Sequence, residues 1–173
     1  MHNQTPVQIA WVTRDLDATE AALSALTGAR KWVRMPGVHF GPDGCTYRGA
    51  PADFVADISL SYAGDTQLEL IAPVSGPSIY TEFLDRAGPG LHHVCLAFPD
   101  VDGFEAAVAA AGRDGSPTVM AGTMPGGMRF AYVSADHAGV PYLEYAYLPP
   151  EIHAFFDHIK QEQKGPCSTS RTR

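Results

Sequence analysis

Four side chains able to bind a metal ion stand at related positions along the chain: Gln8, Glu69, His93 and Glu144. Gln8 and His93 each begin an apolar run, whereas Glu69 and Glu144 each lie in the middle of a strand-like segment. A buried carboxylate is costly unless it is paired, protonated or bound to a metal. Oxygen and imidazole donors without a thiolate suit one divalent ion such as Zn, Ni, Co or Mn. Taken singly, each residue has an ordinary explanation, as a polar strand end, a solvated glutamate or a structural histidine; taken together, they predict one shared metal site.

The positions are related because the chain contains an internal repeat. The stretch that begins at Gln8 aligns, at a constant offset, with the stretch that begins at His93. The matched residues include Asp15 with Asp100, Asp17 with Asp102, Glu20 with Glu105, and Ala21–Ala22 with Ala106–Ala107. Each stretch reads as a strand followed by a helix, and the acid-x-x-Glu spacing from Asp17 and from Asp102 indicates a capping box.

The repeat predicts the elements of two similar halves. Helices are expected over 17–27 and 102–111, ending at Gly28 and Gly112, because glycine readily adopts the conformation of a helix C-cap. Strands are expected near 31–35, 54–62 and 66–72 in the first half, and near 117–121, 128–134 and 140–147 in the second. A glycine- and proline-rich loop over 36–51, a short helix over 78–86 and an amphipathic helix over 151–161 complete the prediction.

The predicted fold class is therefore α+β, with two βαβββ modules forming an open curved sheet around one site. The repeats cover 6–75 and 90–148, and together they form a single domain over 6–148. Residues 149–173 are expected to form a C-terminal helix and a disordered tail.

Composition excludes several classes of function. The formal net charge of the 173 residues is −7, and no basic stripe is present, so no nucleic-acid partner is expected. No apolar run approaches the ~20 residues that a bilayer requires, so a cytoplasmic protein without a membrane partner is expected. Three widely spaced cysteines fit neither a disulfide framework nor a CxxC zinc motif, and Cys95 is interpreted as a small core residue.

These features resemble the vicinal oxygen chelate superfamily, which includes glyoxalase I, methylmalonyl-CoA epimerase, extradiol dioxygenases and bleomycin-resistance proteins. The resemblance covers about 7–148, and it implies the same four metal ligands: Gln8, Glu69, His93 and Glu144. The ligand set is similar to that of glyoxalase I, whereas the sequence from Glu69 to Pro73 and that from Gly88 to Val94 look more like methylmalonyl-CoA epimerase.

Departures from the family pattern bear on the reaction. The region that holds a catalytic glutamate in the epimerases contains no acid here, and His39 is its nearest titratable residue. Val12 replaces an arginine that binds glutathione in glyoxalase I, and Pro73 replaces an asparagine, so glutathione thioester chemistry is not favoured. With Gln8 in place of a histidine, the triad that extradiol dioxygenases need is incomplete.

The resemblance implies a metal-dependent isomerase, epimerase or lyase that abstracts a proton next to a carbonyl of a small organic acid, ketone or acyl thioester. Glu144 or Glu69 would move the proton, and His39 would act on the opposite face. Alternation along the strands suggests substrate-binding residues, and the loop over 36–51 is a candidate lid. The suggested residues are Ser59, Ser61, Gln67, Tyr142 and Arg129.

Two further expectations come from the resemblance. The alternative function is a non-catalytic protein of the bleomycin-resistance type that binds a small molecule. Members of the superfamily usually pair, so a homodimer is expected, with the apolar side of the C-terminal helix near the interface or capping the sheet.

Overall fold

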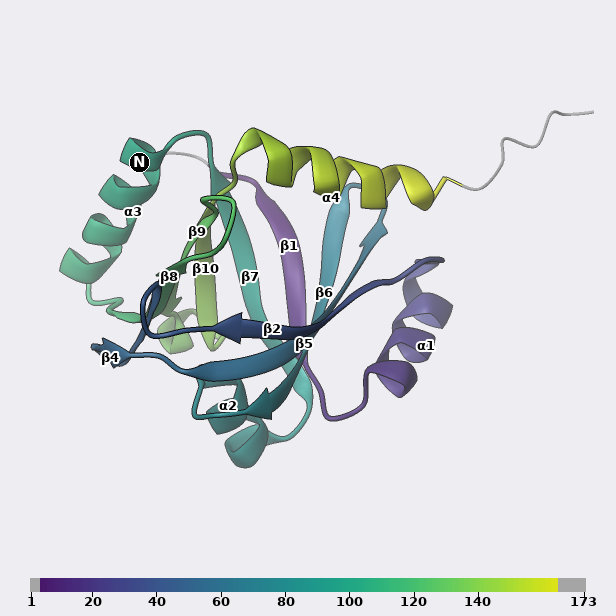
Figure 1. Cartoon of the computed structure of the whole chain (residues 1–173), viewed down its shortest axis with the longest axis horizontal. Helices are drawn as coiled ribbons and strands as arrows, with labels where there is room; N and C mark the ends of the chain where they lie inside the picture. The colour runs from purple at the N-terminus through teal and green to yellow at the C-terminus, as the bar shows by residue number, and fades with distance from the viewer. Residues whose placement is uncertain (1–3, 165–173) are drawn as a thin grey trace, which may run out of the picture.

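The computed structural model describes residues 4–164, and its ten strands form one mixed, strongly curved sheet (Figure 1). The order across the sheet is β2-β5-β6-β1-β7-β10-β9-β8-β3-β4. The strands are β1 (Pro6–Val12), β2 (Val33–Phe40), β3 (Cys45–Tyr47), β4 (Ala50–Pro51), β5 (Phe54–Ala63), β6 (Thr66–Ser75), β7 (Gly90–Phe98), β8 (Thr118–Thr123), β9 (Arg129–Ser134) and β10 (Tyr142–Tyr147). The helices are α1 (Leu16–Thr27), α2 (Ile79–Ala87), α3 (Val101–Arg113) and α4 (Pro150–Glu162), with a short 3-10 turn at Asp136–Ala138.

The duplication predicted from the sequence is confirmed by the topology. The first half contributes β1, α1, β2, β5 and β6, and the second contributes β7, α3, β8, β9 and β10. Within the halves, β1 pairs in parallel with β6 and β7 pairs in parallel with β10. The halves meet where β1 and β7 pair antiparallel, so both first strands lie at the centre of the sheet. The α+β class with a half-barrel sheet follows from this arrangement.

The two repeat helices begin one residue earlier than the sequence pattern suggested, and their N-caps lie two residues before the expected ones. Asp15 accepts a hydrogen bond from the backbone N–H of Ala18, and Asp100 accepts one from Gly103, so these residues are the N-caps. The capping boxes expected at Asp17 and Asp102 were therefore wrong, because Asp15 and Asp100 cap the helices and Asp17 and Asp102 lie within the first turn. The C-cap at Gly28 is confirmed, with φ 78°, whereas α3 runs through Gly112.

The segment over 36–51 does not form a free loop. Residues 33–40 form β2, and residues 45–51 form a hairpin, β3 and β4, that we call the clasp. In the clasp, β3 pairs antiparallel with β8, which belongs to the other half of the chain. Cys45 is buried at this junction. The expectation of a lid over 36–51 was wrong, because backbone hydrogen bonds hold β3 to the sheet.

The C-terminal helix lies across the open side of the curved sheet (Figure 1). Ile159 is fully buried, and Lys160 forms an ion pair of 2.7 Å with Asp65 in the turn between β5 and β6. At the end of the helix, Oε1 of Gln163 accepts hydrogen bonds from the backbone N–H groups of Arg30 and Lys31. The helix thus caps its own sheet, which is one of the two expected arrangements, and the homodimer stays a prediction.

Two further expectations concern the C-terminal tail and membrane-spanning helices. The tail expected to be disordered lies mostly beyond residue 164, outside the described residues. Within the described residues, no helix is long and apolar enough to cross a membrane.

Candidate metal centre and its cavity

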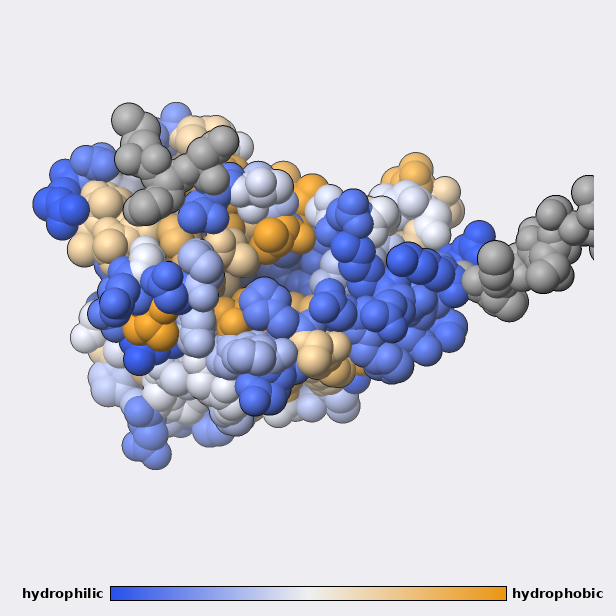
Figure 2. Space-filling view, turned by 90° about the horizontal axis from the view of Figure 1, so that it is seen from above, coloured by the Kyte–Doolittle hydropathy of each residue, from blue (hydrophilic) through white to orange (hydrophobic). Residues whose placement is uncertain are grey.

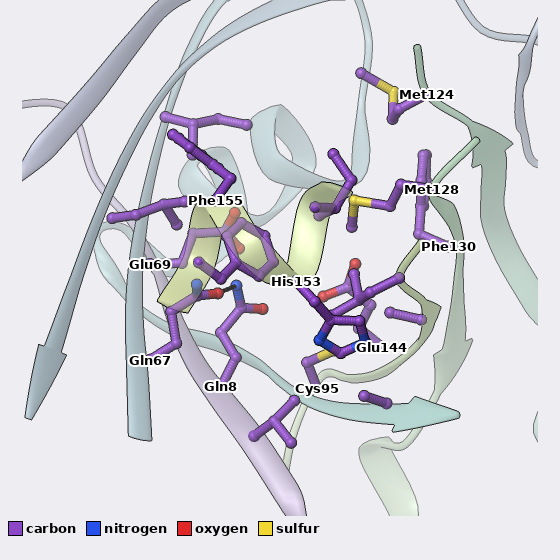
Figure 3. A pocket seen from close by; sticks show the side chains of 18 of the residues that line it. Gln8, Gln67, Glu69, Cys95, Met124, Met128, Phe130, Glu144, His153 and Phe155 are labelled. Carbon is purple, nitrogen blue, oxygen red and sulfur yellow. Dashed lines mark hydrogen bonds between the residues drawn. The ribbon is translucent and has the colours of Figure 1, made fainter. Parts of the chain in front are cut away.

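A cavity of about 340 Å³ occupies the concave side of the sheet. Strands from both halves form its walls and α4 forms one side of its mouth. The view from the side of α4 shows a hollow with apolar side chains gathered beside it (Figure 2). The cavity has a polar end, formed by Gln8, Gln67, Glu69 and Glu144, and a larger apolar part (Figure 3).

Three of the four predicted ligands meet at the polar end. Nε2 of His93 lies 3.3 Å from a carboxylate oxygen of Glu69 and 3.3 Å from one of Glu144. One donor atom from each residue lies within 4.8 Å of the other two, as a shared metal ion requires. The register of the sheet explains this meeting, because Ala10 of β1 stands opposite Glu69 on one side and opposite His93 on the other.

The fourth predicted ligand, Gln8, lines the same end of the cavity. Its amide Nε2 donates a hydrogen bond of 2.6 Å to Oε1 of Gln67, whose own Nε2 donates one of 3.1 Å to the hydroxyl of Tyr62 (Figure 3). This chain of bonds leaves Oε1 of Gln8 buried without a hydrogen-bond partner. A buried carbonyl oxygen without a partner is costly, and a metal ion would satisfy it. The donor set of two carboxylates, one imidazole and one amide oxygen fits a divalent ion.

The charges at this end hold one another in place. Burial by itself would lower the pKa of His93, but the neighbouring carboxylates of Glu144 and Glu69, each 3.3 Å from Nε2, outweigh that effect and raise the pKa to about 9. Burial also raises the pKa of Glu69, although His93 opposes this shift. In the absence of a metal ion, a protonated His93 therefore occupies the position between the two carboxylates.

His92 points away from the carboxylates, toward helix α2, and is not exposed to solvent. The side chain is fully buried between the rings of Tyr80, Phe83 and Tyr142. Its Nδ1 lies 3.0 Å from Nδ1 of His93, at the end of the imidazole away from the carboxylates. Burial, together with the charge of His93, holds the pKa of His92 well below its ordinary value, so this ring stays neutral.

Among the predicted substrate-binding residues, only Gln67 lines the cavity. Ser59 and Ser61 are buried on the other face of β5, where their hydroxyls donate hydrogen bonds of 2.7 Å to Glu20 and to the backbone carbonyl of Lys31. The strand residues that face the cavity are instead Ile58, Leu60 and Tyr62. The inward orientation expected for the two serines was therefore wrong.

The remaining predicted residues also lie away from the cavity. Tyr142 packs against His92, with 4.9 Å between ring centroids, behind the metal ligands. Arg129 forms an ion pair of 2.6 Å with Glu105 of α3 on the outer face. His39 lies at the surface, where its Nε2 is 2.8 Å from a carboxylate oxygen of Asp53. The structure does not bring His39 to the site, so it supports no catalytic part for that residue.

Sequence reasoning missed most of the cavity wall. Three of the five methionines, Met35, Met124 and Met128, line the cavity, as do Phe130 of β9 and the α4 residue Phe156. The alternation of β9 was a usable signal for Phe130, but the methionines lie in irregular positions. Nothing in the sequence indicated that α4 would close this particular space.

Comparison with known proteins agrees with the geometry. The sequence model of the Glyoxalase/Bleomycin resistance protein/Dioxygenase superfamily matches residues 7–132. The chain belongs to this superfamily. A search among curated proteins finds no match.

Solved structures share the fold at low sequence identity. Methylmalonyl-CoA epimerase from Mycobacterium tuberculosis superposes with a TM-score of 0.60 at 19% identity, over 89% of this chain and 96% of that one. A Streptomyces coelicolor methylmalonyl-CoA epimerase variant in complex with 2-nitronate-propionyl-CoA gives 0.58 at 19% identity, over 84% and 98%. A hypothetical protein from Bacillus halodurans C-125 gives 0.62 at 15% identity, over 86% and 96%.

Proposed function

We propose that this protein is a metal-dependent isomerase or epimerase, or a lyase, that moves a proton next to a carbonyl group of its substrate. The observation that carries the proposal is the placement of Glu69 and Glu144 on either side of His93, with Gln8 beside them, at the polar end of the cavity. Epimerases among the solved structures of the same fold support the choice of reaction class.

Gln8, Glu69, His93 and Glu144 would hold the metal ion. Such an ion supplies Lewis-acid stabilisation for the negative charge that develops on a carbonyl oxygen when the neighbouring carbon loses a proton. Gln67 orients the amide of Gln8 through the 2.6 Å hydrogen bond, so that the amide oxygen faces the site. His92 fixes the imidazole of His93 from behind.

Glu69 or Glu144 would take the proton from the substrate carbon and return it to the same carbon or to a neighbouring one. A carboxylate becomes a stronger base when burial raises its pKa, and burial raises that of Glu69. His93, Glu144 and Gln8 are buried, and burial strengthens the electrostatic interactions among these side chains.

The test combines metal analysis with an isotope experiment. The purified protein is expected to contain about one divalent ion per chain, or to accept one on reconstitution. In D₂O, the metal-loaded protein should catalyse exchange of hydrogen for deuterium next to the carbonyl in some members of a panel of ketones, keto acids and short acyl thioesters, followed by NMR. Glu105→Gln, on the outer face, is the control and should exchange as the wild type does.

Non-catalytic ligand binding is the second candidate, and the apolar walls of the cavity favour it. A protein of this kind would bind members of the panel without exchanging their hydrogens and would not need the metal ion. Absence of bound metal after reconstitution, together with absence of exchange, would reject the enzymatic proposal in favour of this one.

A further inference from the structure

The wall of the cavity differs sharply from its polar end. Beyond the metal ligands, the lining is dominated by apolar side chains, which include Met35, Met124, Met128, Phe130, Phe155 and Phe156. Methionine side chains are flexible and polarisable, so they adapt to ligands of different outline. The mouth is narrowed by α4, whose Phe155 remains 37% exposed at its edge. This part of the cavity therefore suits an apolar molecule.

The charged side chains that line the cavity indicate which ligands it disfavours. Among the described residues that line the cavity, the only lysine or arginine is Lys160, and its ammonium group is held by Asp65 at 2.7 Å. Asp65 and Asp157 also belong to the lining. Carboxylates and phosphates are recognised in proteins mainly by arginine and lysine. A ligand with an anionic group in the outer part of the cavity would thus meet carboxylates and no free lysine or arginine, with His153 as the one other lining residue in this part that can carry a positive charge.

Two cations on elements next to the cavity, Lys31 and Arg34, are engaged in ion pairs. Lys31, close to the end of α4, forms an ion pair of 3.0 Å with Glu162. Arg34 on β2 is bonded to Glu20 at 2.7 Å and to Asp17, on the outer face. These pairs leave neither side chain free to bind the phosphates of a nucleotide carrier such as coenzyme A.

We propose that the cavity takes an uncharged, largely apolar ketone-type molecule, whose oxygen reaches the polar end, and that it discriminates against carboxylates and coenzyme A thioesters. The assignment of the oxygen to the polar end rests on the proposed function. The discrimination rests on the walls, and it narrows the substrate class from organic acids, ketones and thioesters to ketones. The cavity volume of about 340 Å³ suits a molecule the size of a substituted aromatic or terpenoid ketone.

A matched pair of probes tests the discrimination. 4-Nitroacetophenone and 4-acetylbenzoate have the same shape and number of non-hydrogen atoms, but only the second is charged at neutral pH. Their dissociation constants are measured by ligand-detected NMR on protein stripped of metal by a chelator, with propionyl-CoA as a third ligand. We expect the nitro compound to bind at least about tenfold more tightly than either anion. Equal or tighter binding of 4-acetylbenzoate or propionyl-CoA would overturn the proposal.

Two variants tie the result to the cavity. Met124→Lys places a cation in the wall and should reduce or reverse the preference for the uncharged probe, whereas Leu26→Lys adds the same charge on exposed α1 and should leave it unchanged. Met124→Leu retains the apolar wall and shows whether side-chain replacement at this position is tolerated. Identical preferences in Met124→Lys and Leu26→Lys would show that the probes bind elsewhere, and this would overturn the proposal.

Because the titrations use metal-free protein, their outcome does not depend on catalysis. Failure of the proposed reaction would appear in the deuterium exchange experiment, with the preference between the probes intact. Failure of the ligand class would appear in the titrations, with metal binding and exchange of other substrates intact.

Discussion

Nδ1 of His92 and Nδ1 of His93 lie 3.0 Å apart, so one imidazole must donate a hydrogen bond to the other. His92 stays neutral because burial lowers its pKa, and it therefore accepts the bond through Nδ1 from the N–H of His93. This assignment leaves Nε2 of His93 directed at Glu69 and Glu144. A buried partner of this kind fixes the tautomer and the orientation of a metal-binding histidine.

Replacing His92 tests this relationship. His92→Phe keeps an aromatic ring in the core but removes the acceptor, and we expect it to weaken metal binding by about ten- to a hundredfold. His92→Asn is the matched variant, because its amide oxygen can accept in place of Nδ1, and it should retain most of the affinity. Competition with a chromogenic chelator gives both affinities, and circular dichroism checks the fold. Equal losses in the two variants would mean that His92 serves packing alone.

Glu144→Gln should weaken metal binding by at least about a hundredfold while keeping the fold, because it removes a charged ligand and preserves the volume. Removal of one carboxylate should also bring the pKa of His93 down from about 9, which NMR of the imidazole measures directly. Glu105→Gln, whose partner is Arg129 on the outer face, is the control. Unchanged metal content in Glu144→Gln would reduce Glu144 to a wall residue.

Metal binding should depend on pH with a definite sign. Below pH about 9, the metal-free protein carries a proton on His93, and a metal ion must displace that proton. The apparent dissociation constant should therefore fall by about tenfold for each unit that the pH rises from 6 to 8, and it should level off near the pKa of His93. Calorimetric titrations in buffers of different ionisation enthalpy count the protons released. A pH-independent affinity would exclude His93 from the ligands.

The internal repeat explains why so much of the site was predictable. Glu69 and Glu144 are conspicuous because each interrupts an apolar strand, and Gln8 and His93 because they align with each other. On β6, the side chains alternate between two faces, and the mid-strand carboxylate of Glu69 indicated which face lines the cavity. On β5 no such residue was present, and the hydroxyls of Ser59 and Ser61 were interpreted as cavity groups although they bond to α1 and to the backbone.

Long-range pairing was the part that the sequence did not predict. The amphipathic pattern of α4 shows that one side must be buried, but any apolar surface would satisfy it, including that of a second chain. The contact between Lys160 and Asp65 that places the helix joins two ordinary surface residues.

The free energy of unfolding of α4 variants reports how firmly this helix is packed on the sheet. Ile159 is fully buried, and Ile159→Ala should lower the free energy of unfolding by about 2 to 5 kcal/mol, because it opens a void under the helix. Phe155→Ala, at the partly exposed edge of the mouth, should cost less than about 1 kcal/mol. Urea denaturation followed by circular dichroism compares the two. Similar small losses at both positions would indicate that α4 is detached in solution.

The pairing of β3 with β8 makes the two halves interdependent. Gly122 at the edge of the second half stands opposite Cys45, which comes from the first half, and it does so at the far end of the sheet from the β1–β7 junction. Neither half has its full complement of strand neighbours without the other. The duplicated modules should therefore unfold in a single cooperative transition, with the amide hydrogens of β8 exchanging as slowly as those of the central strands.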